Sequence, residues 1–360
     1  MNKRTPLYQK HVDLGARMVE FAGFEMPLFY SGITQEHLAV RERSGLFDVS
    51  HMGEFFIEGP ECVEFLQYVT TNDVAALSPC QAQYSCMTNE QGGIVDDMIV
   101  YRFEEEQFML VVNAANIDKD LEHLREYAHR FNVNLINASE SYALLAVQGP
   151  LADTVVQKVT DCEVEAIEPF HVDFCSFGLG GDAVVSRTGY TGSGGFEIFI
   201  ASEYASDLWD KLMEAGREVG LLPCGLGSRD TLRLEKGYCL YGQEIDETTT
   251  PLEAGLEWIV KFHKDFVGRQ TLEKQRKDGI RRKLVGFVLQ EKAIARQGFE
   301  ICTLEGMPVG RVTSGTHSPS LNLPIGLGYV KIEYAKPSTI IGIKVRDKVV
   351  PAEVCKLPFL

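Results

Sequence analysis

The segment AQYSCMTNEQGGIVDDMIVYRF, residues 82–103, decides the fold that we predict for this chain. Its two ends, residues 82–88 and 94–103, are rich in apolar, β-branched and aromatic residues, which favour strands. Between them lies Asn89-Glu90-Gln91-Gly92-Gly93, a loop whose glycines permit positive φ. We therefore expect an antiparallel hairpin at this place.

The segments on either side extend the hairpin into a larger unit. Upstream, Gly59-Pro60 precedes ECVEFLQYV, which we expect to be a helix because Pro suits a first helical turn. Downstream, residues 107–113 read as a strand, and residues 114–131 place apolar side chains at helical spacing. From Val49 to Asn137 the order is strand, helix, two or three strands, helix and strand. This order is typical of a ferredoxin-like unit.

A second alternation of strands and helices follows, and then a β-rich end. The second alternation comprises a strand at 142–148, a helix from Pro150, strands at 182–187 and 195–200, and a helix at 206–219. The last part of the chain repeats short β-rich segments between turn residues, at 284–289, 310–315, 325–330 and 339–345. We predict an α+β fold with a small C-terminal β-domain.

Composition and charge exclude several classes of protein. The chain has 360 residues, 45% of them hydrophobic, and 35 basic against 51 acidic residues give a net charge of −16. An acidic protein repels nucleic-acid phosphates and anionic lipid, so we expect neither partner. No stretch approaches the roughly 20 apolar residues of a membrane-spanning helix, and the start MNKRTPLYQK lacks the apolar part of a signal peptide. Nine scattered cysteines without a C-x-x-C motif suit reduced thiols, so we expect a cytoplasmic protein.

Two adjacent carboxylates in the hairpin are candidates for chemistry. In the strand that begins at Ile94, Asp97 shares a face with Val95, Ile99 and Tyr101, while Asp96 points to the other face. We expect one of the two to be buried and the other solvated. A carboxylate among apolar neighbours is useful beside a cation or a proton. The alternative is a hairpin-end carboxylate that only accepts N–H bonds from the loop.

The run RTGYTGSGGFE, residues 187–197, contains the next candidate. Its glycines resemble a phosphate-binding loop, but neither G-x-G-x-x-G nor G-x-x-x-x-G-K-[ST] occurs, so a nucleotide site is not supported. Glu197 follows the glycines in a strand, where its carboxylate could accept two parallel N–H bonds from a planar heterocycle. The alternative is an ordinary surface glutamate.

A third candidate lies in GLGSRDTLRLE, residues 225–235, which reads as a loop, an N-cap at Ser228 and a helix. Arg229 then falls in the first helical turn, where the helix dipole disfavours a cation, so an anionic partner would explain it. The alternative is an ion pair with Asp230 or Glu235.

Metal and nucleophile motifs are absent from the sequence. The eight histidines never occur at i, i+4, and there is no H-E-x-x-H or G-x-S-x-G motif. The order Asp48, Ser50, His51 does not by itself make a catalytic triad, so we interpret His51 as structural.

These motifs and others resemble one family. The following segments together resemble the aminomethyltransferases, the T proteins of the glycine cleavage system: RTPLYQKHVDLGARMVEFAGFEMPLFY, RERSGLFDVSHMGEF, NEQGGIVDDMIVYR, LVVNAANIDKD, SRTGYTGSGGFEI, GLGSRDTLRLEKGYCLYGQEID and VTSGTHSPSLNLPIGLGYV. The resemblance implies a three-domain cloverleaf ring around a folate cavity. It assigns residues 1–52 with 138–238 to domain 1, 53–137 with 239–278 to domain 2, and 279–360 to domain 3.

The resemblance also implies a reaction and its participants. In that family, the lipoyl arm of the H protein presents an aminomethyl group, and tetrahydrofolate takes its carbon as 5,10-methylenetetrahydrofolate while ammonia leaves. No metal or flavin is implied. Asp97 matches the catalytic carboxylate of the family. Folate-binding positions match Glu197, Arg229, Tyr190, Asn113 and Tyr101, with Tyr84 and Tyr238 as weaker matches.

Two other families are alternatives to this interpretation, and one feature of the chain differs from the family pattern. A folate-binding relative that supports iron–sulfur assembly carries K-G-C-Y-x-G-Q-E, but here KGYCLYGQE transposes Tyr and Cys and inserts one residue, so we interpret Cys239 as a core thiol. Folate domains of dimethylglycine and sarcosine oxidoreductases occur in longer chains with a flavin-binding part. Family members commonly extend past the Pro-Phe near Leu360, so we expect any contribution of such a tail to be missing or replaced.

One segment opposes the overall charge. Residues 261–283 contain nine basic and three acidic residues, a local charge of +6. We consider it a candidate docking surface for an acidic carrier protein, with a solvated linker face as the alternative.

Overall fold

A computed structural model describes residues 2–360, and the chain divides into two compact units. Unit 1 comprises the residues up to Gln67 together with Val74–Ser85 and Met98–Asp230. Unit 2 comprises Tyr68–Asp73, Cys86–Asp97 and Thr231–Leu360. The three-domain boundaries expected from the sequence stay a prediction. In the described part of the chain, no helix combines the length and the apolar character needed to cross a bilayer.

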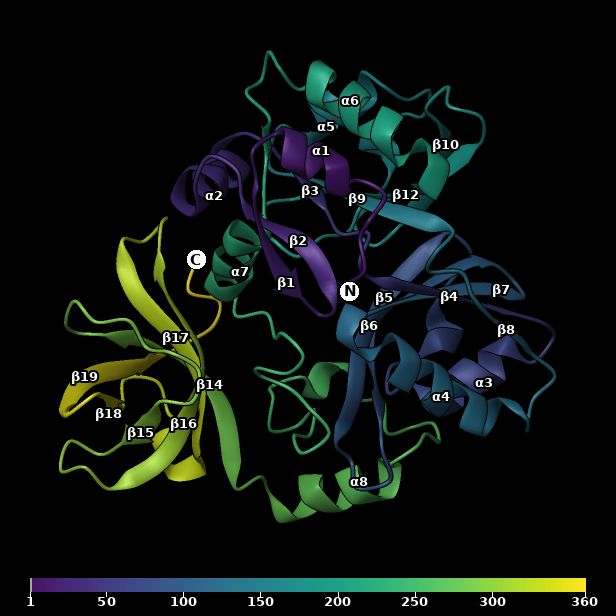
Figure 1. Ribbon diagram of the computed structural model, residues 1–360. Helices are drawn as coiled ribbons and strands as arrows, with labels where there is room; N and C mark the ends of the chain where they lie inside the picture. The colour runs from purple at the N-terminus through teal and green to yellow at the C-terminus, as the bar shows by residue number, and fades with distance from the viewer. Residues whose placement is uncertain (1) are drawn as a thin grey trace. The chain divides into compact units, whose positions relative to one another are not determined.

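The hairpin of residues 82–103 is confirmed and belongs to a five-stranded sheet. The sheet has the order β5-β6-β7-β4-β8, and helices α3 and α4 connect its strands (Figure 1). Strands β6, β7, β4 and β8 form a ferredoxin-like sheet, and β5 adds an edge strand to it. The bounds are β4 Gly53–Glu58, α3 Cys62–Val69, β5 Gln81–Thr88, β6 Ile94–Glu104, β7 Gln107–Val112, α4 Ile117–Ala128 and β8 Asn134–Asn137.

The second alternation forms a six-stranded sheet in unit 1, with the order β10-β11-β12-β9-β3-β13. The predicted strands and helices are present, and the sequence reading missed β10, whose residues mix exposed and buried positions. The place beside β9 is taken by β3, from the N-terminal part of the chain. The bounds are β3 Gly45–Asp48, β9 Tyr142–Gln148, α5 Ala152–Gln157, β10 Val172–Ser176, β11 Asp182–Ser186, β12 Gly195–Ala201, α6 Ala205–Ala215 and β13 Leu222–Pro223.

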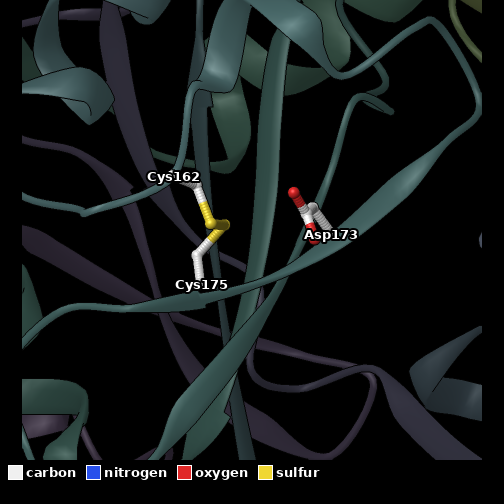
Figure 2. Close-up of side chains that lie close together, drawn as sticks. All are labelled: Cys162, Asp173 and Cys175. Atoms are coloured by element: carbon white, nitrogen blue, oxygen red, sulfur yellow. A yellow bond between two sulfur atoms is a disulfide. The ribbon is translucent and has the colours of Figure 1, made fainter.

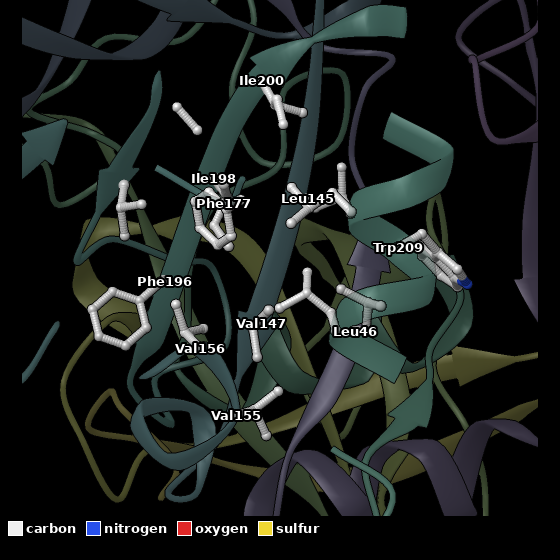
Figure 3. Close-up of a cluster of buried hydrophobic side chains, with 14 of the residues drawn as sticks. Leu46, Leu145, Val147, Val155, Val156, Phe177, Phe196, Ile198, Ile200 and Trp209 are labelled. Atoms are coloured by element: carbon white, nitrogen blue, oxygen red, sulfur yellow. The ribbon is translucent and has the colours of Figure 1, made fainter. Parts of the chain in front are cut away.

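A continuous apolar core joins this sheet to its helices. Leu145, Val147 and Ile198 of the sheet form one buried cluster with Val155 of α5 and Trp209 of α6 (Figure 3). Fully burying such side chains contributes about 1.5–3 kcal/mol each. The core makes the strands that carry the glycine-rich loop a rigid support.

The N-terminal segment adds a two-stranded hairpin and two helices to unit 1. Strands β1 (Arg17–Phe21) and β2 (Phe24–Phe29) pair antiparallel, between α1 (Tyr8–Asp13) and α2 (Ile33–Glu42). Phe21 and Phe24, at the tip of this hairpin, lie edge-on to the ring of His51.

The C-terminal β-domain in unit 2 is confirmed as a closed barrel, with the order β14-β17-β16-β15-β18-β19. Its inward-facing side chains, among them Phe287, Ile301 and Ile343, form a separate core. Helix α8 (Arg269–Asp278) precedes it. The strand bounds are β14 Arg282–Leu289, β15 Glu300–Cys302, β16 Pro308–Ser318, β17 Leu323–Lys331, β18 Ile340–Val345 and β19 Lys348–Cys355.

The predicted N-cap at Ser228 is wrong. Helix α7 spans Leu226–Glu235, so Ser228 lies within its first turn. Its hydroxyl donates to the carbonyl of Gly225 at 2.9 Å instead of capping a free N–H. Ser and Thr inside helices often bond back in this way. Arg229 nevertheless remains in the first turn, as expected.

The expectation that all cysteines are reduced is also wrong. Cys162 and Cys175 form a disulfide, with Cα atoms 5.4 Å apart, while seven other cysteines are free (Figure 2). The pairing arises because the loop before β10 returns along that strand: Thr160 donates to the carbonyl of Ser176 at 2.9 Å. The Cα separation is within the usual range for a disulfide. Spacing alone gave no indication, because the two residues meet only in the folded sheet.

Candidate active site

The glycine-rich loop of unit 1 leads directly into the strand that carries Glu197. At Gly195, φ is +123°, and a Cβ atom would lie 2.2 Å from the carbonyl oxygen of Val147. Only glycine fits this position without displacing backbone. The loop can therefore pass close to β9 before β12 begins.

Glu197 is partly buried and accepts a short hydrogen bond. The hydroxyl of Thr188 donates to its Oε2 at 2.5 Å. Burial raises the pKa of Glu197, and the Thr188 hydrogen bond and the charge of Arg229 oppose that rise. Glu197 is thus not the simple surface glutamate of the alternative reading.

The positive charge of Arg229 acts on the Glu197 carboxylate within unit 1. Its guanidinium stacks over the ring of Tyr190, with Cζ 4.7 Å from the ring centroid. Burial lowers the pKa of Arg229, and the charges of Glu197 and Tyr190 oppose that change. Its Nη1 is buried and donates no hydrogen bond to another described residue. A buried guanidinium nitrogen without an acceptor needs a ligand or an ordered water.

The structure therefore brings together four of the residues expected from the sequence: Glu197, Arg229, Tyr190 and Tyr101. Tyr101 is fully buried, and its hydroxyl lies 3.2 Å from that of Thr188. Two further expected residues of unit 1 lie elsewhere along its strands, Tyr84 on β5 and Asn113 directly after β7.

The other two expected residues, Asp97 and Tyr238, belong to unit 2. Asp96 is fully buried on β6 and Asp97 is partly exposed, which confirms the expected division between the two carboxylates. Burial chiefly, and the charge of Asp97 in addition, raise the pKa of Cys86 to about 12. Burial, followed by the charges of Glu244 and Asp97, raises the pKa of Cys239 well above its usual range. Cys239 is 7% exposed, which confirms a core thiol. Tyr238, after α7, is 39% exposed.

A catalytic triad around His51 is excluded by the contacts of Asp48. Asp48 Oδ2 accepts a hydrogen bond from His11 Nε2 at 2.8 Å and one from Thr5 at 2.7 Å. Ser50 Oγ is 3.3 Å from the carbonyl oxygen of Leu144. Burial lowers the pKa of His51 to about 4, so this imidazole is neutral at pH 7. The structural interpretation of His51 is consistent with this.

Among residues 2–360, one group of side chains has the composition of a metal site: Cys162, Asp173 and Cys175 (Figure 2). The two sulfur atoms are bonded to each other. A disulfide offers no thiolate, and thiolate is the form of cysteine that binds metals.

Comparison with known proteins decides the family. Residues 7–264 match the model of the GCVT N-terminal domain, and residues 282–360 match that of the glycine cleavage T-protein C-terminal barrel domain. This chain belongs to the glycine cleavage T-protein family. The aminomethyltransferase of Bacteroides thetaiotaomicron is 50% identical and that of Halothermothrix orenii 46%, each over 99% of this chain and at least 99% of the relative. The crystal structure of glycine cleavage system aminomethyltransferase T from Bartonella henselae is 37% identical, covers 100% of this chain and 98% of its own, and has a TM-score of 0.95.

Membership in the T-protein family confirms the α+β fold with a C-terminal barrel and the expected enzyme class, aminomethyltransferase. The family uses tetrahydrofolate as a substrate and works within the glycine cleavage system. The full-length matches favour this family over the iron–sulfur assembly and flavin-linked alternatives.

Sequence reasoning missed Thr188, which donates to Glu197, and Gln148, which binds the carbonyl of Thr188. Gln148 is 1% exposed, and its Nε2 donates to the carbonyl of Thr188 at 3.1 Å. Its Oε1 accepts from the hydroxyl of Thr191 at 2.9 Å. Thr188 lies in the run of residues 187–197 and Gln148 at the end of the strand expected at 142–148, but a contact between positions 40 residues apart leaves no mark in periodicity.

Proposed function

We propose that this chain transfers the aminomethyl carbon carried by the lipoyl arm of the H protein to tetrahydrofolate. In the proposal, Glu197, Arg229 and Tyr190 of unit 1 bind the pterin ring. Asp97 of unit 2 is the catalytic carboxylate. Asn113, Tyr101, Tyr84 and Tyr238 are further folate-binding residues that the family resemblance implies.

One observation carries the proposal: a buried guanidinium with a nitrogen that lacks an acceptor stacks over an aromatic ring and interacts with the charge of a partly buried carboxylate. A pterin ring presents adjacent N–H donors, a carbonyl acceptor and a flat face. Glu197 supplies the acceptor for the donors, Nη1 of Arg229 supplies a donor for the carbonyl, and Tyr190 supplies a surface for stacking. The residues present thus fit the substrate that the family uses.

In this reaction Asp97 would stabilise a positive charge and accept a proton. The carbon breaks its bonds to sulfur and to the amino nitrogen and forms two bonds to the folate nitrogens. The two protons lost from those nitrogens end on the thiol and on ammonia, so the atoms balance. A positively charged iminium-like carbon forms on the way. A carboxylate stabilises that charge and accepts a proton from the attacking nitrogen.

Asp97→Asn tests the catalytic role. The variant should fold and bind tetrahydrofolate with an affinity close to that of the wild type, because the amide has the same shape. Ammonia release from aminomethyl-loaded H protein should fall by about 10²–10⁴-fold, the range for loss of a general base. Asp96→Asn, on the opposite face of the same strand, is the matched control and should affect stability more than turnover. Near-normal ammonia release by Asp97→Asn would remove Asp97 from the mechanism.

The assay that tests the whole proposal combines this protein, aminomethyl-loaded H protein and tetrahydrofolate. Formation of methylenetetrahydrofolate with one ammonia per carbon transferred is the expected result. Folate binding without that product would favour the alternative that the chain is a folate-binding relative that supports iron–sulfur assembly.

A further inference from the structure

A network of three hydroxyl groups converges on Glu197. Thr188 is 8% exposed and occupies its centre, 2.5 Å from Glu197 Oε2, 3.2 Å from the hydroxyl of Tyr101 and 3.0 Å from that of Ser186. All four residues belong to unit 1. The proposed function assigns folate binding to two members of the network, Glu197 and Tyr101, and gives Glu197 the contact with the pterin ring.

The direction of the hydrogen bonds follows from counting protons. A threonine hydroxyl has one hydrogen to donate and two lone pairs to accept with. The Thr188 hydrogen goes to Glu197, because that contact is the shortest of the three and its acceptor is a carboxylate. The oxygen of Thr188 is then an acceptor for the Tyr101 hydroxyl, and Ser186 Oγ, 3.0 Å away, is a second acceptor for the same Thr188 hydrogen. Each donation toward the carboxylate strengthens the next one.

The backbone around Thr188 is held in place from the other side. Gln148 Nε2 lies within hydrogen-bond distance of two carbonyl oxygens, Thr188 at 3.1 Å and Phe196 at 3.3 Å. A Cβ atom on the next residue, Gly189, would lie 2.0 Å from the side chain of Gln148. This close packing leaves the Thr188 hydroxyl little freedom to leave Glu197.

Tyr101 is equally constrained. Its side chain is 0% exposed, and its ring packs edge-on against Phe199 with the centroids 5.5 Å apart. Because the Tyr101 side chain is shielded from solvent, its hydroxyl forms a hydrogen bond with Thr188 instead of with bulk water.

We propose that Thr188 is a positioning residue, which, with Tyr101 and Ser186 behind it, orients the Glu197 carboxylate for N–H donors of the pterin. The hydroxyl holds Oε2 and thereby fixes the rotation of the carboxylate, which leaves Oε1 as an acceptor. The inference rests on the proposed function for its ligand. The arrangement of the hydroxyl groups does not depend on it.

The first test compares Thr188→Val with Thr188→Ser in tetrahydrofolate binding. Valine keeps the shape and removes the hydroxyl, whereas serine keeps the hydroxyl. Loss of a hydrogen bond to a charged acceptor should weaken binding by about 10- to 100-fold in Thr188→Val. Thr188→Ser should stay within about threefold of the wild type, since the bond is retained. The matched control is Thr313→Val in the barrel, where the threonine is also 8% exposed and its hydroxyl has no partner among the described residues.

The second test follows Glu197 itself in the protein without folate. The pKa of its carboxyl group is read by ¹³C NMR of labelled glutamate, and Glu197→Gln identifies the resonance. Removing a donor to the ionised form raises the pKa, so the Thr188→Val resonance should titrate at higher pH than in the wild type. Thr188→Ser should restore the titration of the wild type.

The two tests separate the two proposals. An unchanged titration in Thr188→Val would overturn the positioning role, whatever folate does. A raised titration with no loss of binding would overturn the claim that Thr188 acts on the ligand. Unaltered folate binding by Glu197→Gln, in contrast, would contradict the proposed function and leave the hydroxyl network standing.

Discussion

Glu54, on β4, carries a carboxyl group into the interior of unit 1. It is 1% exposed, and neither side-chain oxygen has a hydrogen-bond partner among the described residues. Burial raises the pKa of Glu54 well above the ordinary 4.5, so the folded protein holds this group protonated at pH values where an exposed glutamate is ionised. A neutral acid is tolerated there at a lower cost than a charge.

The pH dependence of stability should reveal this proton. Above about pH 4.5 the unfolded chain releases the Glu54 proton while the folded chain retains it, so folding loses stability as pH rises toward the folded pKa. Glu54→Gln removes this effect. Its stability relative to the wild type should therefore increase with pH by up to about 1.4 kcal/mol per pH unit in that window.

Urea unfolding between pH 4 and pH 8 measures the difference. Glu58→Gln is the matched control, because Glu58 lies on the same face of β4 and bonds to Gln107 at 3.1 Å. If both variants change stability equally at every pH, Glu54 is ionised in the folded state and the interpretation is wrong.

At this scale, sequence reasoning found the residues with unusual chemistry but not their neighbours. Asp97, Glu197 and Arg229 stood out because a charge in an apolar strand or a first helical turn conflicts with its surroundings. Thr188 conflicts with nothing in the sequence. Its importance arises from a contact with a residue nine positions away, and that contact exists only once β11 and β12 pair.

Among the elements, β10 shows how a covalent link can support an edge strand. It pairs with β11 on one side only, and the Cys162–Cys175 disulfide ties it to the preceding loop. The cross-link joins residues 13 positions apart. Closing a loop of this size stabilises the folded state by about 3 kcal/mol in the chain-entropy description.

Replacing both cysteines by serine should therefore lower the free energy of unfolding by about 3 kcal/mol under oxidising conditions. The wild type should lose a similar amount on addition of dithiothreitol, and the double variant should not respond to it. Cys80→Ser is the control, because it removes a free thiol from a residue whose carbonyl accepts a hydrogen bond from Val172 of β10. A wild type whose urea midpoint is insensitive to reductant would contradict a stabilising role of the bond.

The end of α7 presents a second case at this scale. Arg233 is fully buried and bonds to Glu244 at 2.7 Å, and its guanidinium also donates to Ser314 of the barrel at 2.9 Å. Glu235, two residues on, accepts hydrogen bonds from Ser318 and Ser320. The motif that contains Arg229 thus also anchors the barrel within unit 2.

Arg233→Met should cost about 3–5 kcal/mol, because it leaves the Glu244 carboxylate buried without its cation. Arg233→Met with Glu244→Met should recover part of that loss. Arg276→Met is the surface control, since its partner Glu257 is 3.4 Å away and both side chains are more than half exposed. Its cost should not exceed about 1 kcal/mol. Equal losses in thermal unfolding for Arg233→Met and Arg276→Met would show that the buried pair is not an anchor.

Most elements were predictable because their apolar patterns are strong. The strands β6, β9 and β12 read clearly, whereas β10 alternates irregularly and was missed. The N-cap at Ser228 failed for a local reason: serine suits both a cap and a back-bonded position inside the first turn. The place of β3 beside β9 could not be read at all, because about 100 residues separate the two strands.

At the scale of the molecule, the basic run of residues 261–283 divides into two groups of charges. One group of five is engaged within unit 2. Arg282 bonds to Glu253 at 3.3 Å, Arg269 bonds to Glu273 at 2.9 Å, and burial lowers the pKa of Lys264 to about 7. Lys261 donates to the carbonyl of Trp258 at 2.8 Å, and Arg276 lies 3.4 Å from Glu257. The other group is exposed on and after α8, namely Lys274, Lys277, Arg281 and Lys283. Only the exposed group can meet a partner protein without breaking existing contacts.

Under the docking hypothesis, neutralising these four side chains to glutamine should weaken the association with the H protein. We expect KM for the H protein to rise by about tenfold at low salt, because steering by charge acts on encounter, while kcat stays constant. The difference should shrink as salt approaches 0.5 M, where the Debye length falls to a few ångströms. The matched control neutralises Lys292, Lys331, Lys336 and Lys356, which are exposed elsewhere in unit 2 and change the net charge by the same amount. If both quadruple variants raise KM equally, overall charge rather than this surface governs the encounter, and the docking hypothesis is abandoned.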